Sequence, residues 1–106
     1  MYRPLPESLT IKQSGINGLG LFAKEGIAQG TNLGMSHIKL NGNIVRTPLG
    51  GFINHSNTPN IAKVELLMTN HDDIKTKFDY KKWNLVTLRD IKEGEELTVR
   101  YTFYNV

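Results

Sequence analysis

The residues best suited to chemistry lie in a single polar segment, residues 51–60. The triplet Asn54-His55-Ser56 follows an apolar lead-in there, and the segment closes on a Thr-Pro-Asn turn. Pro59 fixes its own φ angle and pushes the residue before it towards extended backbone, while asparagine suits turns. We therefore expect a rigid polar turn that holds side-chain amides and backbone groups against a ligand.

A glycine loop and a tyrosine are the other candidate site segments. Gly18, Leu19 and Gly20 form the loop, in which glycine lets the backbone approach a ligand and leaves N–H and C=O groups free to bind it. Tyr101 ends the segment 94–101, which reads as a turn, a strand and a tyrosine. The plainer interpretations are a tight turn between strands and a core tyrosine bonded to a neighbour.

In the order in which they occur in the chain, the glycine loop, the polar segment and the tyrosine segment together resemble the SET domain, the fold of protein-lysine methyltransferases that use S-adenosylmethionine. The stretch Phe-Ile-Asn-His-Ser-x-x-Pro-Asn, which starts at Phe52, is the most specific of them, and the resemblance runs from about Leu9 to Tyr101. It implies a mainly β fold: a SET-type β-clip of several short sheets with at most one or two short helices. It also implies a C-terminal segment that passes through a loop.

The resemblance also implies residue roles. It makes Tyr101 the catalytic residue, and S-adenosylmethionine the cofactor. The implied cofactor-binding residues are Gly18, Leu19, Gly20, Asn54, His55, Tyr101 and Phe103. The amide of Asn54 can donate and accept, which suits an amino-acid moiety. His55 would contribute its backbone and keep a structural imidazole, and Phe103 would stack on the adenine.

Lysine methylation needs a neutral amine in line with the methyl group of a sulfonium. Free lysine has a pKa near ~10.4, and a narrow apolar channel beside a positive charge would lower that pKa. A well-placed hydroxyl then suffices to align the amine. Tyr101 fits this role, because alternation puts it on one face with Leu97, Val99 and Phe103 and predicts that it points into an apolar interior.

Several positions depart from the family pattern. Arg100 stands where the family usually has an acid, and Val99 where it often has Phe or Tyr. No tyrosine lies between Phe22 and Asp79, so the second aromatic wall near the methyl-transfer pore is missing or built from other residues. These differences keep two other readings open. One is a catalytically weak or inactive SET-like module that binds a partner or the cofactor, and the other is a small β adaptor.

Alternation of apolar and polar residues predicts a mostly β domain of short strands. Asn41-Gly42 is typical of a two-residue hairpin turn between the strands on either side of it. An Ile-x-x-Gly-x-x-Leu pattern occurs twice, from Ile27 and from Ile91. It indicates either two related β pieces or a common turn used twice.

Length and composition limit the remaining possibilities. The 106 residues predict an N-terminal extension at 1–7 and a single minimal SET domain at 8–106, without the cysteine-rich segment of many relatives. No run approaches the ~20 apolar residues of a membrane span. The absence of cysteine excludes disulfides and thiolate-bound zinc. We expect a soluble intracellular protein.

The charges and histidines indicate which partners to expect. His37, His55 and His71 lack the spacing and carboxylate partners of a zinc site, so no metal is expected. The net charge is only +3, and the basic cluster at 75–82 is best interpreted as solvated surface, which argues against direct nucleic-acid binding. The implied partner is a lysine-containing protein or peptide, with histones one candidate class. A homodimer is a second option, because it would cover exposed strand edges.

Overall fold

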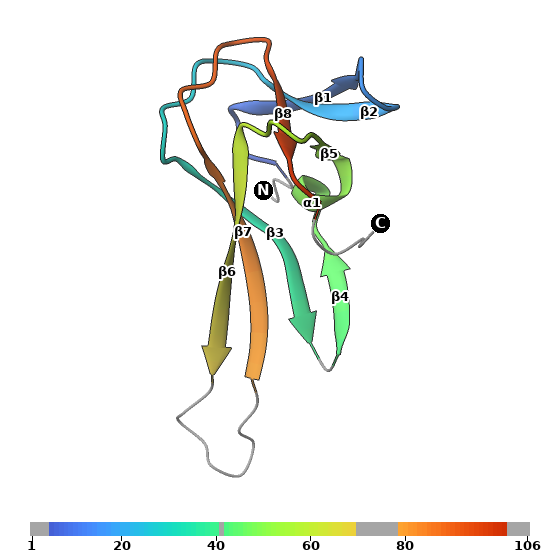
Figure 1. Ribbon diagram of the computed structural model, residues 1–106, viewed down its shortest axis with the longest axis vertical. Coiled ribbons are helices and arrows are strands. Elements are labelled where there is room, and N and C mark those ends of the chain that lie inside the picture. Colours follow the sequence, from blue (N-terminus) through green and yellow to red (C-terminus); the bar gives the residue numbers. More distant parts are fainter. Residues whose placement is uncertain (1–4, 41, 70–78, 102–106) are drawn as a thin grey trace.

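The computed structural model describes residues 5–40, 42–69 and 79–101, and these residues form two four-stranded sheets and one short helix. The first sheet has the order β1-β2-β8-β5 and the second β4-β3-β7-β6 (Figure 1). The strands of the first sheet are β1 (Leu9–Gln13), β2 (Leu19–Ala23), β8 (Glu96–Val99) and β5 (Asn54–His55). Those of the second are β4 (Asn43–Arg46), β3 (Asn32–Leu40), β7 (Asp79–Thr87) and β6 (Ile61–Thr69), and the helix is α1 (Pro48–Phe52).

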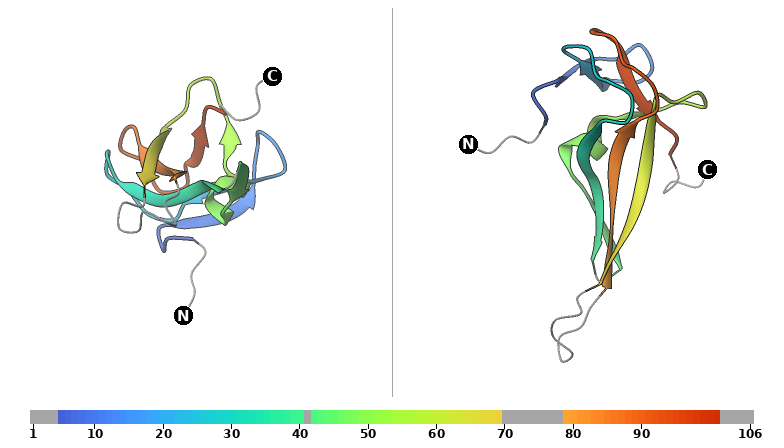
Figure 2. Two further views of the ribbon diagram at one scale, coloured as in Figure 1. Left: turned by 90° about the horizontal axis from the view of Figure 1, so that it is seen from below. Right: turned by 90° about the vertical axis from the view of Figure 1, so that its left-hand side faces the viewer.

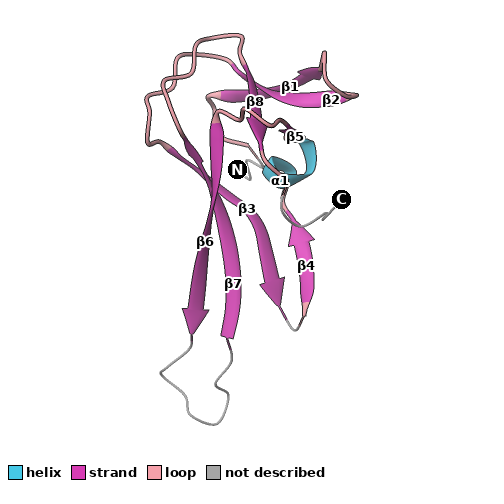
Figure 3. Ribbon diagram, in the orientation of Figure 1, coloured by secondary structure: helices cyan, strands magenta, loops and turns pink. Residues whose placement is uncertain are grey.

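The long strands of the second sheet extend away from the small first sheet, and α1 lies between β4 and β5 (Figures 2 and 3). This arrangement confirms the predicted mainly β fold of several short sheets, and the single helix of the described residues agrees with the expected one or two at most. Residues 102–106, which would form the threaded segment, lie outside the described residues. The threading therefore stays a prediction.

A hairpin joins β3 and β4 as predicted, and Asn41 itself lies outside the described residues. Leu40 pairs with Asn43 across the end of β3 and β4, which leaves a two-residue loop. Gly42 has a φ of 81°, a backbone conformation that glycine adopts readily. The hairpin extends the second sheet and places Thr47 next to the start of α1.

The two Ile-x-x-Gly-x-x-Leu units lie side by side. Ile27 and Ile91 form an antiparallel bridge, with reciprocal backbone hydrogen bonds of 2.9 and 2.8 Å. Both glycines of the pattern have positive φ, 81° at Gly30 and 89° at Gly94, so each unit makes the predicted turn. Each turn leads into a strand, β3 after Gly30 and β8 after Gly94.

The hydrophobic core lies where the two sheets meet. Its most deeply buried members are Leu21, Ile61, Leu85, Ile91 and Leu97. They come from β2, β6, β7, the Ile91 bridge and β8, so the core joins both sheets. Burial of such side chains contributes ~1.5–3 kcal/mol each relative to exposure.

Helix α1 positions the polar segment. Thr47 caps it by accepting a hydrogen bond from the N–H of Gly50, and Pro48 occupies the first turn, where its missing N–H costs nothing. A side chain at Gly50 would collide with the carbonyl of Ser36, so glycine lets the helix pack directly on β3. The helix ends at Phe52, the buried Ile53 follows in extended conformation, and the chain enters β5 at Asn54.

Candidate active site

Strand β5 brings the Asn-His pair to the C-terminal strand. It pairs with β8 in parallel, with Asn54 opposite Thr98 and His55 opposite Val99. The expected packing of the Asn54 segment beside the strand that leads to Tyr101 is therefore present. Two parallel neighbours of this kind have their carboxyl ends at the same sheet edge, where His55 and Tyr101 meet.

Asn54 joins the glycine loop to β8. Four oxygen atoms surround its Nδ2: the Ser14 hydroxyl at 3.1 Å, the carbonyls of Asn17 and Leu19 at 3.1 and 3.2 Å, and Oε2 of Glu96 at 2.8 Å. All four can accept, and only the nitrogen of an amide donates, which fixes the orientation of the side chain. No donor from the described residues is bonded to Oδ1 of Asn54, so this oxygen can accept a hydrogen bond from a ligand.

The glycine loop is the connection between β1 and β2. The N–H of Ser14 donates to the carbonyl of Gly18 at 2.7 Å, and Gly18 has a φ of 46°. The loop is thus a tight turn, as its plainer interpretation says, and Leu19 at its end is exposed. A Cβ at Gly18 would meet nothing within 4 Å, so the backbone here faces open space.

Glu96 is a site residue that the sequence did not reveal. Its carboxylate accepts hydrogen bonds from the Ser14 hydroxyl at 2.8 and 2.9 Å and from Asn54. A Cβ at Gly20 would collide with Oε2 of Glu96, so this glycine leaves the room that the carboxylate fills. Gly-Glu-Glu-Leu reads as an ordinary turn into a strand. Only the pairing of β2 with β8 places Glu96 beneath the loop.

Tyr101 lies just beyond β8 and is tied to the Asn-His segment at two points. Its hydroxyl donates to the carbonyl of Ile53 at 2.7 Å, and its backbone N–H donates to Nδ1 of His55 at 2.9 Å. The prediction that it points into an apolar interior is wrong, because 38% of its surface is exposed. The strand ends at Val99, so alternation no longer fixes the direction of the next side chains.

His55 has a single tautomer in this arrangement. Its Nδ1 accepts from the N–H of Tyr101, so the ring proton is on Nε2, which is 3.2 Å from Oδ1 of Asn57. The imidazole and the Tyr101 ring lie 5.2 Å apart between centroids. Both ring nitrogens have neighbours within the protein, in keeping with a structural imidazole.

Asn60, the last residue of the polar segment, holds β8 in place. Its Nδ2 donates to the carbonyl of Glu96 at 2.9 Å, and its Oδ1 accepts from the N–H of Thr98 at 2.8 Å. The side chain is buried and its amide satisfies backbone groups. The Asn60 amide therefore bonds the backbone of β8 and does not face a ligand. The expectation that the amides of the polar segment are held against a ligand is wrong for this residue.

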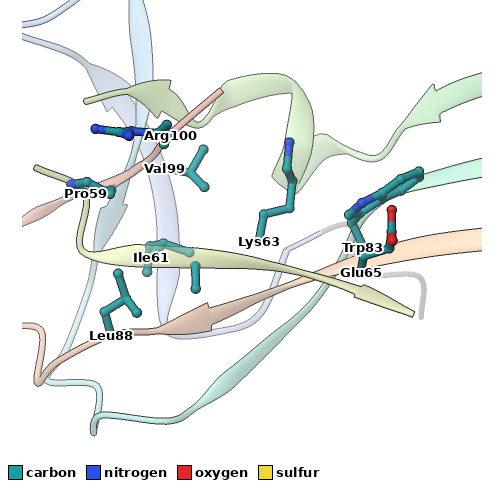
Figure 4. Close-up of a pocket in the computed structure, with 9 residues that line it drawn as sticks. Pro59, Ile61, Lys63, Glu65, Trp83, Leu88, Val99 and Arg100 are labelled. Carbon is teal, nitrogen blue, oxygen red and sulfur yellow. The ribbon is translucent and has the colours of Figure 1, made fainter. Parts of the chain in front are cut away.

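A pocket of about 440 Å³ borders the end of β8 (Figure 4). It is lined by Pro59, Ile61, Ala62, Lys63, Glu65, Trp83, Leu88, Val99 and Arg100. Burial lowers the pKa of the Lys63 ammonium, whose side chain stands between Val99 and Trp83. Arg100 also donates to the carbonyl of Asn57 at 3.4 Å, so it links the pocket to the polar segment.

The remaining predictions concern Phe103, His71, a metal site and a membrane span. Phe103 and His71 lie outside the described residues. Within the described ranges, no cluster of His, Asp and Glu has the make-up of a metal site. In the same part of the chain, no helix has the length and apolar character needed to cross a membrane.

The SET domain sequence model matches residues 35–102, more than half of the chain and the part that contains both the polar segment and Tyr101. The chain belongs to the SET domain family. Members of this family are generally protein-lysine methyltransferases that use S-adenosylmethionine.

A solved structure agrees with this assignment. The crystal structure of a Plasmodium falciparum protein, provisionally described as a histone methyltransferase, matches with a TM-score of 0.66 and 18% identity. The match covers 92% of this SET domain and 95% of the other chain. At that identity the likeness shows a shared fold. A search of curated protein sequences finds no match.

Proposed function

We propose that this SET domain transfers the methyl group of S-adenosylmethionine to the ε-amine of a lysine in a protein or peptide. The observation that carries the proposal is the contact of Asn54 Nδ2 with the Asn17 and Leu19 carbonyls, because it joins the two implied cofactor-binding segments. Tyr101 is bonded to the residue on each side of Asn54. The glycine loop, the polar segment and Tyr101 therefore all contact Asn54 or one of its two neighbours in sequence.

The residues present fit an amino-acid moiety. Gly18 faces open space, which leaves room for a ligand against the loop backbone. Oδ1 of Asn54 can accept from an ammonium group, while the exposed loop offers backbone groups to a carboxylate. Gly18, Leu19, Gly20, Asn54 and the His55 backbone would hold the cofactor. When bound, it supplies an electrophilic methyl group on a positively charged sulfur.

Tyr101 would align the substrate amine. Its hydroxyl proton is directed to the Ile53 carbonyl, and a hydroxyl that donates in this way presents its oxygen lone pairs as acceptors. An amine N–H bonded to that oxygen would leave the amine lone pair free to react. The lysine ammonium would first release one proton to solvent, and the neutral amine would then take the methyl group, with an N–C bond formed and the S–C bond of the cofactor broken. No strong base is needed if the amine arrives neutral.

A labelled-methyl assay on histones and a lysine-peptide array tests the proposal. Histones belong in the assay because the Plasmodium falciparum protein of the same fold carries a histone methyltransferase description. Incorporation into lysine by the wild type is the expected result. Saturable binding of S-adenosylmethionine without incorporation on a broad array would favour the non-catalytic module. Failure of the folded protein to bind the cofactor at all would overturn the proposal.

A further inference from the structure

The charge of Glu96 is not balanced by a cation from the described residues. Its hydrogen-bond donors are the neutral Ser14 hydroxyl and the neutral Asn54 amide, and no described lysine or arginine forms an ion pair with it. Its neighbour Glu95 differs, because Arg89 reaches that carboxylate at 2.8 Å. Of these two adjacent carboxylates, Glu95 is paired with a cation, and Glu96 is paired with none from the described residues.

Glu96 also lies where its charge can act on a ligand. The carboxylate fills the space that a Cβ at Gly20 would need and accepts from the amide of Asn54, so it lies beside both elements proposed to bind the cofactor. The nearby carbonyl oxygens of Asn17 and Leu19 turn towards the same amide. This side of the site therefore has a negative electrostatic potential. The negative charge is that of the Glu96 carboxylate, next to Gly20, which has no side chain to separate them.

We propose that the Glu96 carboxylate makes the site select for cationic ligands, so that S-adenosylmethionine binds more tightly than its demethylated product. This inference rests on the proposed function. The methyl donor carries a sulfonium, an ammonium and a carboxylate, for a net charge of +1, whereas the product is a thioether with net charge zero. The two ligands differ by one methyl group and one positive charge, and the Glu96 carboxylate attracts the ligand that carries this charge.

The size of the effect follows from Coulomb's law. Unit charges about 10 Å apart at an effective dielectric constant of about 20 attract by an amount equivalent to roughly a tenfold change in a dissociation constant. A preference of this size would help product leave after transfer, because the site loses its attraction when the sulfonium becomes a thioether. Glu96 is thus a positioning residue for Asn54 and a specificity-determining residue for the cofactor.

Calorimetric titration of wild type and Glu96→Gln with three ligands tests the inference. The ligands are S-adenosylmethionine, S-adenosylhomocysteine and an analogue in which a protonated amine replaces the sulfonium. Glutamine keeps the size of the side chain and one oxygen that can accept from Asn54, replaces the other oxygen with an N–H donor, and removes the charge. Glu93→Gln, at an exposed position, changes the net charge equally and serves as the control.

We expect the ratio of product to donor dissociation constants to fall about tenfold in Glu96→Gln and to stay unchanged in Glu93→Gln. The amine analogue should follow the donor, which separates charge from the methyl group. An unchanged ratio in Glu96→Gln overturns the inference and leaves the proposed function intact. No binding of any ligand to folded wild type overturns the proposed function instead. If Glu96→Gln does not fold, equal affinities of wild type for the three ligands overturn the inference.

Discussion

The backbone N–H of Tyr101 donates to Nδ1 of His55 at 2.9 Å, so one of the two bonds that hold this tyrosine does not involve its hydroxyl. The rings of the two residues also lie in contact, 5.2 Å between centroids. Removal of the hydroxyl should therefore leave the ring and the backbone where they are. This makes the role of one oxygen atom testable.

Tyr101→Phe should reduce methyl transfer by ~10² to 10⁴-fold while cofactor affinity stays nearly constant, because orientation and proton-transfer contributions of single groups have that size. The labelled-methyl assay and calorimetry measure the two quantities. Tyr80→Phe, the same change on β7, is the matched control. Equal rates in Tyr101→Phe and wild type would remove this hydroxyl from the mechanism.

Asn54→Ala should weaken S-adenosylmethionine binding at least tenfold. The substitution removes Oδ1 as an acceptor and also detaches the Asn17 and Leu19 carbonyls from β5. A thermal-shift titration measures binding, since a ligand at 100 times its dissociation constant stabilises by about 2.7 kcal/mol. Asn57→Ala, in an exposed position of the same segment, should bind as wild type does. Similar losses in both variants would mean that the segment acts only through its fold.

Gly20→Ala should damage the site more than Gly15→Ala. A Cβ at Gly20 would collide with Oε2 of Glu96, whereas at Gly15 it meets nothing within 4 Å. The carboxylate would have to move, and with it the bonds to Ser14 and Asn54. Cofactor titration and thermal unfolding of both variants check this. A normal affinity in Gly20→Ala would show that the close approach of the two strands is dispensable.

Asn60→Ala should lower the free energy of unfolding by ~2–4 kcal/mol. It leaves the carbonyl of Glu96 and the N–H of Thr98 without their amide partner, and an unsatisfied buried group costs ~1–3 kcal/mol. Urea denaturation measures the loss, with Asn57→Ala as the exposed control. Surface substitutions usually change the free energy of unfolding by up to about 0.5 kcal/mol, and a loss no larger than this in Asn60→Ala would contradict the account.

Stability should also depend on pH through His37. Burial, with Lys63 and Arg46 nearby, lowers the pKa of its imidazole from 6.5 to about 4. Between these values the unfolded chain binds the proton and the folded chain does not, so stability is complete above pH 6.5 and falls as the pH drops towards 4. The loss should be on the order of 3 kcal/mol. Urea denaturation at several pH values measures it, and His37→Phe should flatten the slope. A flat profile in wild type from pH 6.5 to 4 would contradict this.

The fold was the more predictable part of this SET domain. The Asn41-Gly42 pair and the two Ile-x-x-Gly-x-x-Leu units are local signals, because glycine adopts the positive φ of a tight turn at no steric cost. The order of the three motif segments indicated the family, and strand alternation indicated the β class. Each of these depends on residues close together in the sequence.

The site was less predictable because its contacts cross between strands. The distance of Glu96 from Ser14 and Asn54 depends on the register of β2 against β8, which no local pattern specifies. Asn60 satisfies β8 rather than a ligand for the same reason. Tyr101 is exposed because β8 ends two residues earlier, at Val99, and strand boundaries are poorly determined by alternation.

The reciprocal hydrogen bonds of Ile27 and Ile91 have a consequence for how the protein forms. They join residues far apart in the sequence, and β8, the next strand after Ile91, pairs with β2 in the first sheet. Contacts between such distant residues slow folding, because the entropy of a long loop is lost before they form. On the ribosome, β2 therefore keeps an open edge until β8 emerges, a state prone to wrong pairing. The glycine loop and Asn54 can meet Glu96 only after β8 has emerged, so a nascent chain should not bind the cofactor before β8 has been synthesised.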